Sequence, residues 1–195
     1  IPNIRHVVLY HMPFNEIEFN QMSGRAGRDG KPATIHLLFG RADARINERI
    51  LHDMTPDHDV MAQVYRRLRA VQRMSGSPFF SMGNVELAAL SSSRACTVSP
   101  ASVACGVAVF RELGLVETHV AYASGEITRS IHVNNVESKV ELTDSVRYRE
   151  GLDERDIFNT FRDWAMRADT ASLRMRVSRP IVPGGLAGAS AAESD

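Results

Sequence analysis

The stretch from Ile4 to Phe39, IRHVVLYHMPFNEIEFNQMSGRAGRDGKPATIHLLF, decides the predicted fold. Its two ends, residues 4–10 and 33–39, are short apolar runs rich in β-branched side chains, which is typical of buried strands. Between them Asn15 is placed to cap a helix that continues to about Arg25. A second helical pattern follows over residues 43–54. The order strand, helix, strand, helix predicts part of a parallel α/β sheet.

Apolar residues at helical spacing predict which side of each helix is buried. In the first helix these residues are Ile17 and Phe19. In the second helix they are Ile46, Ile50 and Leu51. We expect these residues to be the apolar contacts of the two helices.

The decapeptide QMSGRAGRDG, residues 21–30, carries the chemistry of this stretch. Arg25 and Arg28 are three positions apart at the end of the predicted helix, where two side chains can converge on one target. Gly24 and Gly27 remove side-chain bulk, so that a ligand can approach the backbone closely. Two guanidinium groups that are always charged suit a polyphosphate.

This decapeptide resembles motif VI of superfamily 2 helicases, most closely the RecQ type, whose pattern is Q-x-x-G-R-A-G-R-D-G. The resemblance covers residues 1–55, where the family has the second of its two RecA-like domains. It implies that Arg25 and Arg28 reach the γ-phosphate of an ATP held by the other RecA-like domain. It also implies that Gln21 helps to sense that phosphate and that the motif glycines line the nucleotide site.

Two elements of the resemblance are absent from the sequence. There is no G-x-x-x-x-G-K-[ST] phosphate loop and no acidic Walker B strand, so we expect no ATP hydrolysis by this chain alone. ATP and Mg²⁺ are expected in the full-length parent, and no cofactor in this fragment. The chain begins at Ile1 rather than Met, which suggests a piece of a longer protein. Its two cysteines, Cys96 and Cys105, cannot form the four-cysteine zinc module with which RecQ proteins usually continue.

Residues 56–140 are predicted to form a winged helix, that is, three helices followed by a β-hairpin. Thr55-Pro56-Asp57 marks the start of this domain. The predicted elements are a long helix with Val60, Val64, Leu68 and Val71 on one face, a loop over residues 75–81, a short helix over residues 85–90, a helix that begins at Ser99-Pro100 and ends before Gly114, and strands over residues 115–122 and 127–133 joined at Ser124-Gly125. The whole chain is therefore predicted to be α/β followed by α+β.

Residues 141–169 are predicted to form a carboxyl-terminal helical segment that opens near Thr143 and packs on the preceding domain. Its apolar stripe consists of Ile157, Phe161 and Trp164. Residues 170–195 are rich in Arg, Pro, Gly, Ala and Ser, and are predicted to be a flexible tail.

The second half of the chain resembles the carboxyl-terminal region of some RecJ-type single-strand exonucleases. The resemblance lies in VFRELGLVE at residues 109–117, in the hairpin, and in ELTDSVRYREGLDE at residues 141–154. It spans residues 60–165, but the catalytic carboxylate and histidine motifs of that family are not in the chain. The two resemblances together imply a fragment of a RecJ-like and RecQ-like fusion protein that acts in DNA repair and recombination.

Several polar side chains in the second half are candidates for contact with nucleic acid. They are Arg66, Arg67, Arg69 and Arg73 on the long helix, Ser102 and Arg111 on the third helix, and Arg129 in the hairpin. A solvated helix face explains the four arginines equally well. The third helix is mostly small and apolar, which favours packing or protein contact over the reading of bases.

Composition limits the remaining possibilities. The 195 residues contain 23 Lys and Arg and 23 Asp and Glu, so a globally basic nucleic-acid coat is excluded and any such binding needs a local patch. No apolar run approaches the roughly 18 residues of a membrane span. The seven histidines have no metal-ligand spacing, and no metal site is predicted. Two cysteines do not make a disulfide framework, which favours the cytoplasm.

The sequence thus predicts the carboxyl-terminal part of an ATP-dependent DNA helicase with a winged-helix accessory domain for DNA or intramolecular contacts. The alternative is a non-catalytic module that binds protein or DNA and retains a degenerate helicase remnant. The expected partners are single-stranded or forked DNA and the missing RecA-like domain. Two strands leave an open sheet edge, which a second copy or the chain's own tail is expected to cover.

Overall fold

The protein was analysed as a computed structural model, which describes residues 3–123, 126–136 and 139–178. The chain divides into two compact units. Unit 1 contains residues 1–44 and 157–195, and unit 2 contains residues 45–156. The division therefore lies inside two helices rather than at Thr55-Pro56-Asp57.

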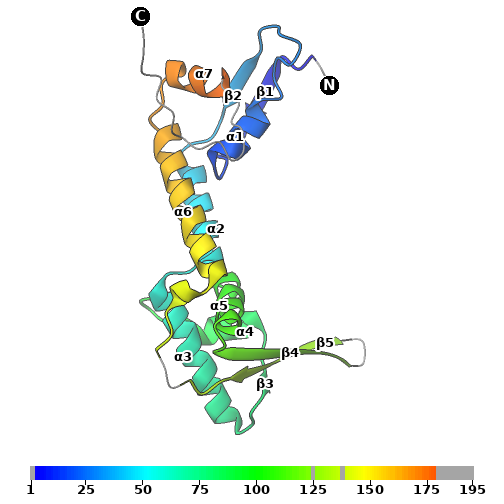
Figure 1. Ribbon diagram of the computed structural model, residues 1–195, viewed down its shortest axis with the longest axis vertical. Helices are drawn as coiled ribbons and strands as arrows, with labels where there is room; N and C mark the ends of the chain where they lie inside the picture. Colours follow the sequence, from blue (N-terminus) through cyan, green and yellow to red (C-terminus); the bar gives the residue numbers. More distant parts are fainter. Residues whose placement is uncertain (1–2, 124–125, 137–138, 179–195) are drawn as a thin grey trace, which may run out of the picture. The chain divides into compact units, whose positions relative to one another are not determined.

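Unit 1 is built on a small parallel sheet (Figure 1). Its elements are β1 (His6–Leu9), α1 (Glu16–Ser23), β2 (Thr34–Leu37), the start of α2 (Arg41–Met54), the end of α6 (Val146–Ala165) and α7 (Thr170–Ser178). In the parallel pairing His6 lies opposite Thr34 and Leu9 opposite Leu37. The predicted strand–helix–strand arrangement is confirmed, with both strands shorter than expected.

Aromatic side chains join the first helix of unit 1 to the end of α6. Phe19 is buried and lies 5.9 Å from Phe161 and 5.8 Å from Trp164, measured between ring centroids. The predicted stripe is correct at these two α6 positions. It is wrong at Ile157, which is 54% exposed, because Phe158 takes the buried position instead.

The other apolar predictions for the first two helices hold in part. Ile17 of α1 is 47% exposed, because Phe19 alone turns to the core. Ile46 and Ile50 of α2 are also exposed, whereas Leu51 is buried.

Within the part of the chain that the structure describes, one face of the β1–β2 sheet is left uncovered. Val8, Tyr10 and Leu38 are all more than half exposed on it. Parallel sheets normally bury both faces under helices. Among the described residues each of the two strands also pairs on one side only, so the predicted open edge is present.

The beginning of the predicted flexible tail is a helix, α7, and this part of the prediction is wrong. Asp169 accepts a hydrogen bond from the backbone N–H of Ser172 (2.8 Å) and so starts the helix. Arg176 forms an ion pair with Glu16 (2.6 Å) and lies over the Trp164 ring, 4.6 Å from its centroid. These polar contacts add to the half-buried side chains of Leu173 and Val177, which face the same side of α7. Residues 179–195 of the predicted tail lie outside the described residues.

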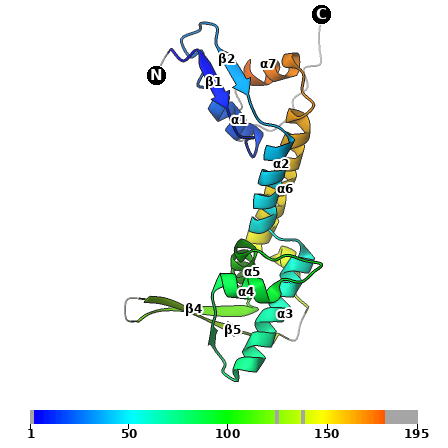
Figure 2. The same cartoon turned by 180° about the vertical axis from the view of Figure 1, so that it is seen from behind.

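Unit 2 combines three complete helices and parts of two others with a three-stranded antiparallel sheet. Its elements are the rest of α2, α3 (His58–Ser75), β3 (Phe80–Ser81), α4 (Asn84–Ser91), α5 (Pro100–Glu112), β4 (Val116–Ala123), β5 (Glu126–Val133), the 3₁₀ turn η1 (Leu142–Asp144) and most of α6. The strand order is β3-β5-β4. Figure 2 shows β4 and β5 extending beyond α3, α4 and α5.

Local sequence signals of unit 2 are largely confirmed. The Ser99 side chain caps α5 by accepting from the Ser102 N–H (3.0 Å), and Pro100 occupies the first turn. Gly114 has φ +70°, as a left-handed helix end requires. The two predicted strands pair as a hairpin, while the turn residues Ser124-Gly125 lie outside the described residues. The strand β3 was not expected, because residues 75–81 were predicted to be a loop.

The core of unit 2 lies between its helices and its sheet. The largest fully buried side chains there are Met61, Val64 and Leu68 of α3, Leu87 of α4, Val103, Val109 and Phe110 of α5, and Ile131 of β5. A Cβ atom on Gly106 would lie 3.4 Å from Val64, so this glycine lets α5 approach α3 closely. The predicted apolar face of α3 is confirmed at Val64 and Leu68.

Helix α6 holds the segment Thr55-Pro56-Asp57 in place. The hydroxyl of Tyr148 donates to the carbonyl of Pro56 (3.0 Å), and Arg155 donates to the carbonyl of Thr55 (3.0 Å) and to the Asp57 carboxylate (2.8 Å). Burial, followed by the nearby charge of Asp57, raises the pKa of Tyr148. This segment is therefore a fixed part of unit 2 rather than a linker.

Candidate functional site

The predicted nucleotide motif forms a sequence of turns after α1. The helix ends at Ser23, and the N–H of Gly24 donates to the Asn20 carbonyl (2.8 Å). Gly27 and Gly30 have φ values of +64° and +76°, which disfavour any residue with a side chain. Arg25 and Arg28 lie in these turns. The argument that they share a helix face at spacing i, i+3 is therefore wrong, and backbone turns place them instead.

The motif loop is tied to the first strand at two points. The N–H of Gly27 donates to the carbonyl of Ile4 (3.1 Å). Arg5 donates to Asp29 Oδ1 (2.9 Å) and forms an ion pair with the same carboxylate. These hydrogen bonds hold the pKa of Asp29 below its ordinary value. The loop is thus fixed against β1 while its other side chains stay outside the core.

The side chains predicted to meet a nucleotide are exposed. Gln21, Arg25 and Arg28 all lie on the surface, and Arg28 Nε donates to the Gly24 carbonyl (3.2 Å). Neither arginine forms an ion pair with any described acidic residue. The arrangement leaves two guanidinium groups available for an anion. Among the described contacts, Arg28 is hydrogen-bonded to Gly24. The side chains of Gln21 and Arg25 have no described hydrogen bond to Arg28 or Gly24.

Two residues of this loop were missed as positioning groups, Arg5 and Asp29. They are 24 positions apart, and the segment before β1 that carries Arg5 gives no local sign of the pairing. The one available signal is the aspartate inside the decapeptide, directly after Arg28.

In unit 2 the structure separates the predicted nucleic-acid residues into two groups. Arg66, Arg69, Arg73 and Arg111 are exposed. Arg67 is partly buried, Arg129 donates to Asn84 Oδ1 (2.6 Å) in a partly buried site, and Ser102 is 3% exposed against Ser99. Burial lowers the pKa of Arg129.

The prediction that Ser102 presents its hydroxyl to bases is therefore wrong. The side chain belongs to the buried end of α5, where it lies 3.0 Å from the Ser99 hydroxyl. Arg129 is engaged in holding the hairpin to the start of α4 through Asn84.

A half-open cavity of about 480 Å³ lies in unit 1 between β2 and α7. Its lining is largely apolar, with Arg174 as the single charged side chain. Within the described residues no three His, Cys, Asp or Glu side chains gather as metal ligands. None of the described helices has the length and apolar character needed to cross a membrane.

Comparison with known proteins relates the amino-terminal part of the chain to helicases. Residues 1–30 match the family described as helicase conserved C-terminal domain. The chain is 37% identical over 71 residues to "Probable ATP-dependent DNA helicase RecS" of Bacillus subtilis. It is 48% identical over 42 residues to a Caenorhabditis elegans protein with the provisional name ATP-dependent DNA helicase Q1. No solved structure gives a significant match.

These similarities cover a small part of each protein. The first alignment covers 36% of this chain and 14% of the Bacillus protein, and the second covers 22% and 7%. Both relatives are named as ATP-dependent DNA helicases. Residues 1–30, which include the whole glycine–arginine motif, are thus similar to the helicase conserved C-terminal domain.

Proposed function

We propose that Arg25 and Arg28 contact the γ-phosphate of ATP in an ATP-dependent DNA helicase of the RecQ type. In such a protein the ATP and its Mg²⁺ are held by another RecA-like domain, and this chain supplies the motif VI arginines. A positively charged side chain near the γ-phosphate stabilises the charge that develops during phosphoryl transfer. Gln21, Gly24 and Gly27 would complete the contact surface.

The observation that carries this proposal is the state of the two guanidinium groups. Both are exposed, and neither is neutralised by a described carboxylate. The acidic residue nearest in sequence, Asp29, is occupied by Arg5. The loop therefore keeps its own carboxylate away from the arginines and presents positive charge, which fits the terminal phosphate of a nucleotide.

The uncovered sheet face supports a further RecA-like part as partner. Val8, Tyr10 and Leu38 are exposed on a parallel sheet, and sheets of this class are normally covered on both faces. The unpaired edges of β1 and β2 provide positions for more strands, or for a second copy of the chain.

For unit 2 we propose a winged-helix accessory domain. The order α3, β3, α4, α5, β4, β5 supports this assignment, since three helices precede an antiparallel hairpin and a short strand joins the same sheet. The RecJ-type resemblance of residues 60–165, the place in DNA repair and recombination, and the cytoplasmic location belong to the same proposal.

The test is Arg28→Ala in the longer helicase to which this chain is assigned. ATP turnover stimulated by DNA should fall on the order of 10³-fold or more, because the variant loses charge stabilisation in the transition state. Binding of ATP should be largely retained. The matched control is Arg49→Ala, which removes an exposed arginine of α2 outside the motif.

Unchanged turnover in Arg28→Ala would refute the catalytic role and leave the alternative, a binding module with a degenerate helicase remnant. The chain by itself should hydrolyse no ATP, since it has neither a phosphate loop nor a Walker B strand. The proposal also requires that ATP be held by another RecA-like domain. ATP turnover by the isolated chain that is lost with Arg28→Ala would contradict this requirement.

A further inference from the structure

Positive charge is concentrated on α3 in unit 2. Helices α3, α4 and α5 together contain five arginines and three acidic residues, Asp59, Glu86 and Glu112, and four of the five arginines lie on α3. The chain as a whole has no net charge, so acidic residues are correspondingly concentrated elsewhere. This region therefore provides the local basic patch that nucleic-acid binding requires of a neutral protein.

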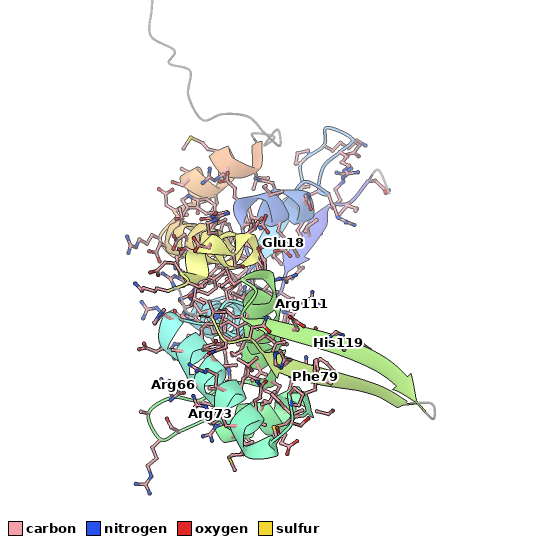
Figure 3. All side chains as sticks on the ribbon, turned by 60° about the horizontal axis from the view of Figure 1, so that its bottom comes forward. Glu18, Arg66, Arg73, Phe79, Arg111 and His119 are labelled. Atoms are coloured by element: carbon pink, nitrogen blue, oxygen red, sulfur yellow. The ribbon has the colours of Figure 1, made fainter. Side chains whose placement is uncertain are left out.

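Three of these arginines form one stripe along α3. Arg66, Arg69 and Arg73 follow one another at spacings of three and four residues, which places them on the same side of a helix. The buried residues Met61, Val64 and Leu68 occupy the other side. Figure 3 shows Arg66 and Arg73 on the side of α3 away from β4 and β5. We call these three residues the α3 arginine stripe.

The α3 arginine stripe is free to bind an anion. All three side chains are exposed, and none forms an ion pair with an acidic residue of the described chain. Arg66 Nε donates to the carbonyl of Ala62 (3.2 Å), which fixes the base of its guanidinium and leaves its two Nη groups for a ligand. The one acidic residue of α3, Asp59, is seven positions before Arg66, so no acidic residue lies three or four positions from any of the three arginines.

The residues around the stripe favour a polyanion over a protein partner. The positions beside the arginines on this side of α3 include two small residues, Ala62 and Ala70, and a single exposed large apolar side chain, Met74, follows Arg73. Protein interfaces have an apolar core in which charged residues are depleted, often with large aromatic side chains. A guanidinium stripe without such a core instead fits phosphate groups, which accept two hydrogen bonds from each arginine.

We infer that the α3 arginine stripe binds the phosphodiester backbone of DNA without reading its sequence. The stripe extends over seven residues, or about 10 Å. Each strand of duplex DNA carries about one phosphate for each 3.4 Å of the helix axis, so about three phosphates of one strand can meet three arginines. The inference relies on the proposed function only for DNA as the partner, and it is independent of Arg25, Arg28 and ATP.

This surface differs from the one that helix order alone selects. In helix-turn-helix proteins the later helix enters the groove. The corresponding helix here, α5, buries Ser102 and exposes mainly small residues, with Arg111 at its end. Contact through α3 would therefore position unit 2 on the phosphate backbone of DNA, without recognition of the bases.

The test measures binding of the full chain to labelled oligonucleotides by fluorescence anisotropy, with single-stranded and duplex DNA as separate arms. The variant Arg66→Gln/Arg69→Gln/Arg73→Gln is compared with Arg45→Gln/Arg49→Gln/Arg167→Gln, a control with the same change in charge at exposed arginines outside the stripe. Salt is titrated between about 50 and 200 mM. Circular dichroism verifies that each variant is folded.

We expect the slope of log K against log salt to become less steep by about 2 to 3 in the stripe variant, at about 0.7 to 0.9 for each lost phosphate contact. The control variant, Arg45→Gln/Arg49→Gln/Arg167→Gln, should change this slope by less than half as much. Equal losses in the two variants, or salt-independent binding by the wild type, would overturn the inference. So would binding of poly-glutamate with no binding of either oligonucleotide, which would indicate an acidic protein partner. ATP is absent from every arm, so the outcome does not depend on the nucleotide site.

Discussion

The motif loop of unit 1 and helix α3 of unit 2 both present exposed arginines, but the chain positions them by different means. In the loop, backbone turns at Gly27 and Gly30 and the Arg5–Asp29 pair set where Arg25 and Arg28 lie. On α3, the regular helix spaces Arg66, Arg69 and Arg73, while a core on its opposite side holds the helix.

The difference indicates what each set of arginines depends on. A change in the loop frame is expected to displace Arg25 and Arg28 directly, because backbone turns and the Arg5–Asp29 pair hold the loop. The α3 arginine stripe can be replaced without removing any buried contact, while a change in the core should weaken the helix as a whole. Mutations in the loop frame, in the core of unit 2 or in a charged pair should therefore affect the two regions differently.

The largest effect on stability is expected from Phe110→Ala in the core of unit 2. Phe110 is 2% exposed and lies 5.2 Å from the Tyr65 ring, so its truncation leaves a cavity between α3 and α5. We expect a loss of about 3–5 kcal/mol in the free energy of unfolding. Hydrogen–deuterium exchange should show faster exchange in α3, α4 and α5.

The control for this variant is Met74→Ala on α3, where the side chain is 86% exposed. It should leave exchange unchanged in all three helices. The comparison fails if Phe110→Ala accelerates exchange in β1 and the motif loop as strongly as in α3, since the two regions would then share one stabilising core.

A smaller effect is expected from Gly27→Ala in the loop frame. An alanine must adopt φ +64°, which costs about 1–2 kcal/mol, and its Cβ would lie 3.0 Å from the Lys31 carbonyl oxygen. Crowding adds about 1 kcal/mol. Denaturation of unit 1 can be followed through Trp164, the single tryptophan.

Gly30→Ala is the matched variant. It has the same sign of φ, at +76°, but no atom within 4 Å of the added Cβ. The free energy of unfolding should therefore fall only by the cost of placing an alanine at positive φ, without the cost of crowding. If Gly30→Ala were as damaging as Gly27→Ala, contact with Lys31 would not be what fixes the loop.

The smallest effect is expected from the Arg5–Asp29 pair, and it depends on pH. Hydrogen bonds from Arg5 lower the pKa of Asp29 below its ordinary value of 3.8 in the folded chain. The pair therefore stabilises the loop above that value, and its contribution is lost as pH falls through the lower folded value. Denaturation of wild type and Asp29→Asn, followed by Trp164 fluorescence, should differ at neutral pH and converge in acid. A difference that grows toward low pH would contradict the pairing.

Local signals in the sequence were sufficient for most elements. The Asn15 and Ser99 caps, the apolar face of α3 and the glycine after α5 act within a few residues, and each is confirmed. The strand β3 could not be predicted in this way, because its two residues are defined by pairing with β5, about fifty positions later. Helix α7 likewise depends on contacts with Glu16 and Trp164.

The candidate site was predictable at the level of residue types but not of geometry. The decapeptide indicated the arginines and glycines, whereas the frame around them depends on Arg5, which lies in another element. In unit 2 the burial of Ser102 could have been inferred, since it is four residues before Gly106 and seven before Val109 on the buried side of α5. The function of both arginine sets remains for experiment.

The contacts of α6 with Thr55 and Pro56 have a practical consequence for dividing the chain. A cut at this segment would remove the carbonyl groups that accept from the Tyr148 hydroxyl and the Arg155 guanidinium. Gly151, whose missing side chain makes room for Thr55, would then face solvent-filled space. An independently expressed second half would therefore have to begin upstream, within α2. Only then would α6 keep its hydrogen bonds to the carbonyl groups of Thr55 and Pro56.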